Sequence, residues 1–235
     1  MNDHSGKTDE PILEVIACSV EDAIDAEKGG ADRLEVISDL ESGGYTPSLD
    51  LVREIRDTVG LPLRVMLREQ ACYGLTEIIT VEKLCCVANE FNGMKLDGVV
   101  LGFLRSGYVD VELTQKILGC APDLKATFHH AFEDAKDNKA AIRAIKRIPQ
   151  IDKILSHGGY GSPELRVENL REYALSAGPE IQILAGGRIG LEMIRELRMN
   201  TPIREFHVGS AARRNGRVSS ERVQELSEVV KSLYV

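Results

Sequence analysis

Residues 12–37 read ILEVIACSVEDAIDAEKGGADRLEVI and contain one strand–helix–strand unit. The segments 12–18 and 32–37 are short, apolar and rich in Val, Ile and Leu, which predicts two strands. Ser19 begins the amphipathic stretch between them, and Gly29-Gly30 ends it, as is typical of helix caps. Two strands joined by a helix pair in parallel through a right-handed crossover.

The same unit recurs about eight times along the chain. Predicted strands occupy residues 12–18, 32–37, 63–68, 97–103, 124–129, 153–156, 181–185 and 205–208. Eight such units in 235 residues predict an α/β protein, a single (β/α)8 TIM barrel with parallel strands. The barrel domain is expected to span residues 11–235, after a flexible polar tail at residues 1–10. Active sites of this fold lie at the C-terminal ends of the strands.

Composition narrows the class of partner and the compartment. A formal net charge of −8 argues against nucleic acid as the main partner, because nucleic-acid binders usually carry a basic face. No apolar run approaches the ~20 residues of a membrane span. Five cysteines without a CxxC motif, in a chain whose first residues do not read as a signal peptide, predict reduced thiols and a cytoplasmic protein.

Polar side chains are predicted on the inner face of the barrel. Side chains alternate along a strand, so residues that share the parity of inward positions face the interior. The polar residues assigned in this way to the inner wall or the upper rim are Glu14, Glu35, Arg68, Thr127, His129 and His207. Their convergence at strand ends makes them the candidates for chemistry.

This polar set has two interpretations. Buried carboxylates are costly unless paired, and Glu14, Glu35 and Arg68 come from three consecutive strands, so a Glu–Arg–Glu network could fix strand register. The alternative is a site for binding or proton transfer, which the two histidines favour. In that case the catalytic residues are Glu14, Glu35, Arg68, His129 and His207. Both interpretations fail if the two glutamates point outward toward the helices.

Further histidines and two glycine-containing turns border the predicted mouth. His130 is expected to point outward because it follows His129, whereas His157 is expected at the mouth. Loops after the last two strands of this fold commonly bind phosphate through backbone N–H groups. The predicted anion-binding residues are therefore Gly186, Gly187, Arg188, Ser210 and Arg213. Tight turns that need glycine are the alternative explanation.

Seven segments together resemble the CutC copper-homeostasis family. They are 30–35 GADRLE, 43–48 GGYTPS, 65–68 VMLR, 127–132 TFHHAF, 154–158 ILSHG, 185–187 AGG and 205–207 EFH. The set keeps the order of the family and spans nearly the whole domain. The resemblance implies a TIM barrel, a cytosolic location, a homodimer, and a role in copper homeostasis with copper, as Cu(I), bound.

The sulfur ligands that such a role implies are only partly present. Members of the family often carry cysteine in the first strand and at the end of the second, where this chain has Ile16 and Ile37. Thiolate and thioether ligands select Cu(I), so the candidate metal ligands are Cys18, Met66 and Cys72. Packing of Cys18 inside the barrel is its alternative role.

Three functions stay open from the sequence. The first is a copper-binding homeostasis protein. The second is an enzyme of lyase, isomerase or hydrolase type, which acts on a small phosphorylated or carboxylated sugar or carbonyl compound with Glu35 or His129 as acid or base. The third is a scaffold dimer without catalysis. Lys125 and Lys153 begin their strands, far from the mouth, which argues against a Schiff-base aldolase.

Overall fold

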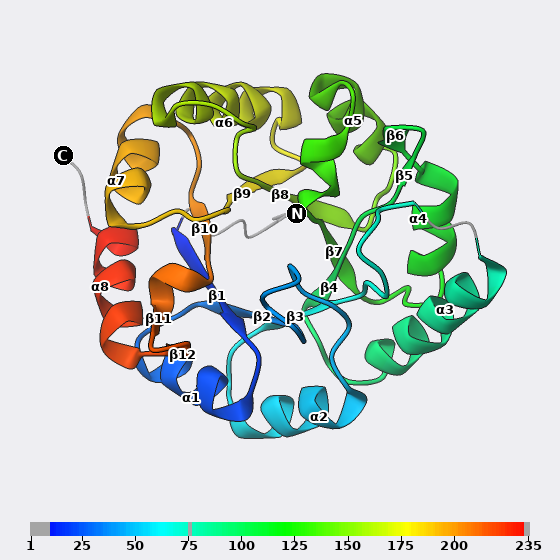
Figure 1. Ribbon diagram of the computed structural model, residues 1–235, viewed down its shortest axis with the longest axis horizontal. Helices are drawn as coiled ribbons and strands as arrows, with labels where there is room; N and C mark the ends of the chain where they lie inside the picture. The colour runs from blue at the N-terminus through cyan, green and yellow to red at the C-terminus, as the bar shows by residue number, and fades with distance from the viewer. Residues whose placement is uncertain (1–9, 75–76, 233–235) are drawn as a thin grey trace, which may run out of the picture.

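Eight parallel strands close into a barrel in the computed structural model, which describes residues 10–74 and 77–232 (Figure 1). The strands are β1 (Ile12–Ala17), β2 (Arg33–Val36), β3 (Leu63–Met66), β4 (Gly98–Leu101), β7 (Lys125–Phe128), β8 (Ile151–Ser156), β9 (Gln182–Ala185) and β10 (Glu205–Val208). Their order around the barrel is β1-β10-β9-β8-β7-β4-β3-β2. The predicted (β/α)8 TIM barrel is confirmed. The predicted tail lies, except for residue 10, outside the described residues.

Eight helices of the described chain surround the barrel. They are α1 (Val20–Lys28), α2 (Leu49–Thr58), α3 (Ile78–Asn92), α4 (Val111–Leu118), α5 (Asn138–Ile145), α6 (Pro163–Ala177), α7 (Leu191–Asn200) and α8 (Ser220–Lys231). The side chains of Ser19, Ser48, Asp110 and Ser162 each accept a hydrogen bond from the backbone N–H three residues later, which satisfies a donor of the first helical turn. Within the described ranges, none of these helices has the length and apolar character needed to span a bilayer.

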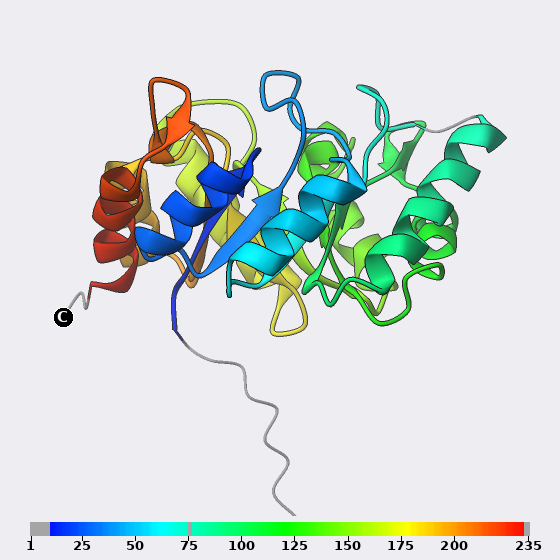
Figure 2. The same cartoon turned by 90° about the horizontal axis from the view of Figure 1, so that it is seen from below.

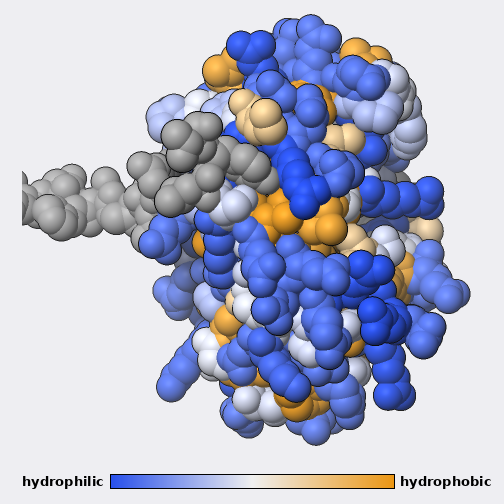
Figure 3. All heavy atoms as spheres, turned by 90° about the vertical axis from the view of Figure 1, so that its left-hand side faces the viewer, coloured by the Kyte–Doolittle hydropathy of each residue, from blue (hydrophilic) through white to orange (hydrophobic). Residues whose placement is uncertain are grey.

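Two short hairpins and two 3-10 helices of the described residues lie at the end of the barrel where the strands terminate. They are the hairpins β5 (Leu104–Arg105) with β6 (Tyr108–Val109) and β11 (Arg213–Arg214) with β12 (Arg217–Val218), and the 3-10 helices η1 (His130–Asp134) and η2 (Ser210–Ala212). Figure 2 shows the β11–β12 hairpin and the loop 38–47 rising above the same end. On the outer side of the barrel, the face that carries α7 and α8 is mostly hydrophilic (Figure 3).

Ion pairs fill the barrel interior below its mouth. Arg33 donates from Nε to Glu14 and from Nη2 to Glu205 at 2.6 Å, and Lys153 reaches Glu205 at 2.7 Å. Glu14 and Arg33 are register partners on β1 and β2, so the pairing follows from the sheet. The cation predicted to neutralise the glutamates was Arg68, and that prediction is wrong because Arg33 takes this role. Lys153 lies in this lower network, as its place early in the strand indicated.

A second buried arginine completes the lower interior. Arg64 is 1% exposed and binds Asp152 through two hydrogen bonds of 2.7 and 2.8 Å. It also donates to Asp97 at 2.7 Å and to the hydroxyl of Thr127 at 2.7 Å. Thr127 therefore faces the interior as predicted, but it supports structure rather than lining the mouth. Above these charges lies a small apolar layer, formed by Ile16, Ile37, Met66 and Val100.

Candidate functional site

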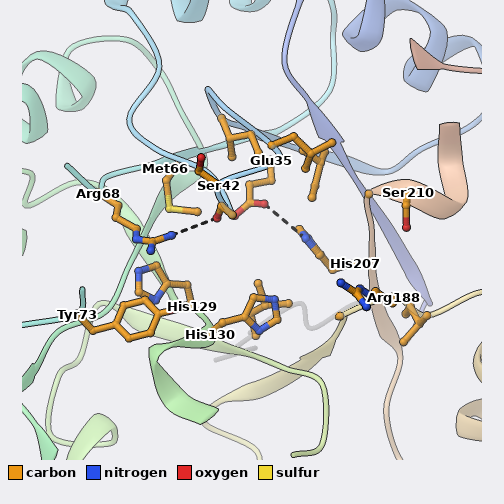
Figure 4. Close-up of a pocket in the computed structure, with 18 residues that line it drawn as sticks. Glu35, Ser42, Met66, Arg68, Tyr73, His129, His130, Arg188, His207 and Ser210 are labelled. Atoms are coloured by element: carbon orange, nitrogen blue, oxygen red, sulfur yellow. Dashed lines mark hydrogen bonds and ion pairs between the residues drawn. The ribbon is translucent and has the colours of Figure 1, made fainter. Parts of the chain in front are cut away.

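A cavity of about 400 Å³, the mouth pocket, opens at the C-terminal ends of the strands. Four predicted catalytic residues line it: Glu35, Arg68, His129 and His207. Glu14 lies below them, behind His207. Both glutamates are almost fully buried inside the barrel, so the parity prediction that placed them inward is confirmed. Figure 4 shows the side chains of Glu35 and His207 pointing toward each other.

A carboxylate–imidazole–carboxylate row forms the floor of the mouth pocket. Glu14 Oε1 lies 2.8 Å from His207 Nδ1, and His207 Nε2 lies 3.5 Å from Glu35 Oε2. Glu14 and His207 are register partners on the paired strands β1 and β10, which explains their contact. The other oxygen of Glu35, Oε1, is buried and has no hydrogen-bond partner among the described residues. It is therefore an acceptor available to a bound molecule.

Burial and neighbouring charge separate the pKa values of the two glutamates. Burial would raise the pKa of Glu14, but Arg33 and His207 outweigh it and hold that pKa far below its usual value. Burial raises the pKa of Glu35 to about 7, and the charge of Glu14 adds to this effect, while His207 and Arg33 oppose it. Burial would lower the pKa of His207, yet Glu35 and Glu14 together raise it. Glu35 thus changes charge near neutral pH.

Two neutral histidines occupy the opposite wall. Burial, and then Arg68, lowers the pKa of His129 to about 3. His129 Nδ1 accepts the backbone N–H of Ala131 at 3.2 Å, so its proton is on Nε2. Burial, and then His207, lowers the pKa of His130 to about 3 as well. His130 lines the pocket, so the expectation that it points outward is wrong: β7 ends before it, and the alternation of a strand no longer applies in η1.

Arg68 holds the loops of the mouth together. It donates hydrogen bonds to four backbone carbonyls, those of Gly43, Gly44, Gln70 and Ala71. Its guanidinium carbon also lies 5.2 Å from the ring centre of Tyr45 and 5.1 Å from that of Tyr73, within cation–π range. Arg68 contacts the pocket, but most of its donors serve loops 38–47 and 67–74. Its predicted pairing with the glutamates does not form.

The predicted anion-binding residues are only partly brought together. Gly187, Arg188 and Ser210 line the mouth pocket, whereas Gly186 packs beneath it: a Cβ there would meet Leu155 at 2.7 Å. Arg213 is turned away, because it pairs with Asp22 at 2.7 Å. It also donates to the carbonyl of residue 16 at 3.1 Å. Of the two predicted arginines, only Arg188 remains a cation available to a ligand in the mouth pocket.

The sulfur atoms do not converge on one point of the mouth pocket. Met66 lines the pocket, and Cys18 packs against the apolar layer with its Sγ 3.6 Å from Arg213 Nη2. Cys72 is exposed and accepts a hydrogen bond from Gln70 Nε2 at 3.0 Å. Burial raises the pKa of the Cys18 thiol, which disfavours the thiolate that binds Cu(I). This donor set does not fit a Cu(I) site built from several sulfurs.

Isoleucines stand where the resemblance implied thiols. Ile16 and Ile37 both line the mouth pocket and give it an apolar wall. In the part of the chain that the structure describes, no group of three His, Cys, Asp or Glu side chains is arranged to hold a metal ion. The geometry therefore brings together an acid–base pair and a cation, but no cluster of metal ligands.

Sequence reasoning missed Tyr73 and Glu133. Tyr73 lines the mouth pocket, with its ring centre 5.1 Å from that of His129. Glu133 accepts hydrogen bonds from Ser156 Oγ at 2.6 Å and from the N–H of His157 at 2.7 Å, which fixes the loop after β8. The signal for Glu133 was its position four residues after the histidine that ends a strand. No comparable signal indicated Tyr73.

Comparison with known proteins decides the family. The model of the CutC family matches residues 11–212. The chain belongs to the CutC family. A family protein CutC of Xylella fastidiosa strain 9a5c is 30% identical over 209 residues, which cover 87% of this chain and 78% of that protein. The human "Copper homeostasis protein cutC homolog" is 29% identical over 208 residues, covering 87% and 75% respectively.

A solved structure of a relative has the same fold. The putative copper homeostasis protein CutC of Streptococcus agalactiae superposes with a TM-score of 0.78 and 23% sequence identity. The match covers 85% of this chain and 98% of that structure. At this identity the likeness supports the barrel alone. The names of these relatives refer to copper, whereas the residues that line the mouth pocket of this CutC family member suit acid–base chemistry.

Proposed function

We propose that this CutC family member is an enzyme that moves a proton on a small anionic carbonyl or sugar compound. The observation that carries this proposal is Glu35, which has a pKa of about 7 and one carboxylate oxygen without a partner among the described residues. A group with such a pKa is present in both protonation states near neutral pH. It is therefore suited both to remove a proton and to return it.

In the proposed reaction, ionised Glu35 takes a proton from the carbon next to a carbonyl group. The electron pair of the broken C–H bond forms the carbon–carbon double bond of an enolate, and the carbonyl electrons move to oxygen. Protonated Glu35 then returns the proton to carbon, so substrate and product contain the same atoms. The apolar wall of Ile16, Ile37 and Met66 excludes water from this exchange.

Neutral imidazoles suit the other half of this step. His129 carries its proton on Nε2 and lines the mouth pocket, so it can donate a hydrogen bond to the oxygen that becomes charged. The buried Nδ1 of His130 has no partner within the described residues, which leaves this ring available to a ligand as well. Because their pKa values are about 3, both rings stay neutral donors near pH 7.

Glu14 and His207 have a positioning role. Glu14 holds the Nδ1 side of the imidazole, so Nε2 is directed at Glu35. The imidazolium form of His207 stabilises ionised Glu35, and Arg33 keeps Glu14 charged beneath both. The row therefore fixes both the orientation and the charge of the proposed base.

Deuterium exchange tests the proposed reaction. The protein would be incubated in D₂O with a panel of phosphorylated and carboxylated sugars and carbonyl compounds, and deuterium bound to carbon would be measured by mass spectrometry. We expect deuterium exchange into at least one compound. In Glu35→Gln the exchange rate is expected to fall by at least about 10²-fold. Glu54→Gln, an exposed change on α2, is the matched control and is expected to match the wild type. Exchange that does not depend on Glu35, or none at all, contradicts the proposal.

Copper binding is the second candidate function. It is favoured by the name of the human relative and by Cys18, which packs against the same apolar layer as Met66. An anaerobic competitive Cu(I) titration of the wild type beside Cys18→Ser separates the two functions. We expect weak binding that is equal in both proteins. Tight 1:1 binding that is lost in the variant would favour the copper role.

Two properties implied by the resemblance stay predictions. Light scattering behind size-exclusion chromatography tests the homodimer, for which one mass twice that of the chain is expected. Cell fractionation tests the cytosolic location. The scaffold alternative requires a dimer. It is refuted if the protein has the mass of a single chain, binds no Cu(I) and catalyses no deuterium exchange.

A further inference from the structure

A second cavity of about 400 Å³, the side hollow, lies beside the mouth pocket. It is formed by the loop after β8, the start of α6 and the loop after β9. It is lined by His157, Gly159, Tyr160 and Arg166, and it shares Gly187 and Arg188 with the mouth pocket. The two cavities are therefore adjacent, and Gly187 and Arg188 form part of the wall of both.

We infer that the side hollow binds a phosphate group, held by Arg188 and Arg166, at a distance from the carbon that reacts over Glu35. This deepens the proposed function by naming the substrate class as phosphate monoesters. It rests on the proposed function for the reaction, but the binding of the anion does not need Glu35. The site lies between the loops of β8 and β9 and not between the last two loops, where the sequence placed it.

Uncompensated positive charge is the first support. Among the residues that the structure describes, two guanidinium groups and no carboxylate line the side hollow, in a protein whose formal net charge is −8. Arg188 is exposed and makes no hydrogen bond or ion pair with any described residue. Its side chain lines the mouth pocket and lies beside His207 in Figure 4. An arginine with all its donors open, beside a cavity, suits an oxyanion.

Arg166 is fixed in place with donors to spare. Its Nε donates to the carbonyl of His157 at 2.7 Å, and its Nη2 donates to the carbonyl of Gly187 at 2.9 Å. These two bonds tie the loop after β8 to the loop after β9 and leave Nη1 without a partner among the described atoms. The side chain of Arg166 therefore loses little conformational entropy when an anion binds, which is the advantage of a preorganised site.

The backbone of the shared wall is unusual in a way that fits binding. Arg188 has φ of +60°, in the left-handed region that favours glycine, and Gly187 before it has φ of +72°. A side chain at residue 187 would collide with His157, so glycine is needed there. Non-glycine residues in this conformation cluster at ligand clamps. Here the turn carries the free arginine to the boundary of the two cavities.

Two arginines on different elements favour phosphate over carboxylate. Arg166 comes from α6 and Arg188 from the loop after β9, so they present N–H groups from separate backbones. A tetrahedral phosphate offers three oxygens in different directions, while a carboxylate accepts in one plane. Tyr160 is 81% exposed at the edge of the side hollow, with its ring centre 5.3 Å from that of His157. Its ring therefore borders the solvent-exposed side of the side hollow.

Amide NMR of the whole protein tests this site with inorganic phosphate as the probe. At constant ionic strength and pH 7, phosphate is expected to shift the amide signals of Gly159, Gly161 and Gly187. Arg188→Gln is expected to weaken binding at least tenfold, with Arg188→Lys between the two. Arg53→Gln removes the same charge from α2, and Glu35→Gln removes the proposed base; both are expected to bind like the wild type. Signals outside the side hollow report whether each variant is folded.

The possible outcomes separate the two proposals. The phosphate site is overturned if no amide signal shifts up to about a 50-fold molar excess of phosphate over about 1 mM protein. It is also overturned if Arg188→Gln binds phosphate as tightly as the wild type. Acetate that binds as tightly as phosphate overturns the choice of phosphate. Phosphate binding that depends on Arg188, together with no deuterium exchange, keeps the site and refutes the proposed reaction. Exchange that depends on Glu35 without phosphate binding does the reverse.

Discussion

Replacing Glu35 by glutamine is expected to stabilise the protein, and to do so more as the pH rises. In the folded protein, burial raises the pKa of Glu35 from 4.5 to about 7. Between these two values the folded state holds the proton more tightly than the unfolded state. The free energy of unfolding of the wild type therefore falls as the pH rises through this range. Glutamine does not ionise, so the variant lacks this loss.

The magnitude follows from the pKa alone. Glu35 is 2% exposed, so solvent screening does not reduce it. At about 1.4 kcal/mol for each pKa unit, the rise from 4.5 to about 7 corresponds to about 3 kcal/mol. At pH 8 the variant is expected to be more stable than the wild type by about 3 kcal/mol more than at pH 4.5.

Urea unfolding of both proteins at several pH values between 4.5 and 8 measures this difference. Glu14→Gln is the matched control with the opposite sign, because Arg33 and His207 outweigh burial and hold the pKa of Glu14 below its usual value. Its charge stabilises the fold above about pH 4.5 and this contribution is lost in acid, so its removal is expected to destabilise at pH 8. An advantage of Glu35→Gln that is the same at pH 4.5 and pH 8 refutes the reasoning.

Two further predictions concern the barrel. Arg33→Met leaves Glu14 and Glu205 without their shared arginine and is expected to lower the free energy of unfolding by about 3–5 kcal/mol in urea titrations; a loss below about 1 kcal/mol contradicts the buried network. Gly98→Ala places a Cβ 2.5 Å from a backbone oxygen of β7 and is expected to lower the free energy of unfolding by about 3 kcal/mol or more. Gly190→Ala is the control: its Cβ would have nothing within 4 Å, so its loss is expected to be less than about 1 kcal/mol. Equal losses in these two variants refute the close approach of β4 and β7.

The barrel could be predicted because its signals are local. Alternating strands and capped helices fixed the element order, and strand parity placed Glu14, Glu35 and His207 inside. Parity also indicated the cation that pairs with Glu14. Arg33 shares the parity of Glu35 and lies opposite Glu14 in the parallel register. Arg68 was chosen instead because it was placed on the next strand with the parity of Met66, but β3 pairs only as far as Met66. Its side chain is free of the sheet and binds loop carbonyls.

Features beyond the strand ends could not be read from parity. His130 belongs to a 3-10 turn, where alternation fails, and it therefore enters the pocket. Arg213 follows the last strand but is held by Asp22, a partner 191 residues away in the sequence. The β11–β12 hairpin did have a signal, because Asn215-Gly216 is a two-residue turn in which both residues have positive φ. Conformations set by distant partners need the folded structure.

The charge state of Glu35 near neutral pH is the central claim, and it can be measured directly. The protein would be labelled with ¹³C at the glutamate side-chain carboxyl carbon, and the signal of Glu35, assigned with Glu35→Gln, would be followed from pH 4 to pH 9 by NMR. A midpoint near 7 that moves when His207 is replaced by glutamine is the expected result. A midpoint near the ordinary value of 4.5 contradicts the claim and removes Glu35 as the proposed acid–base group.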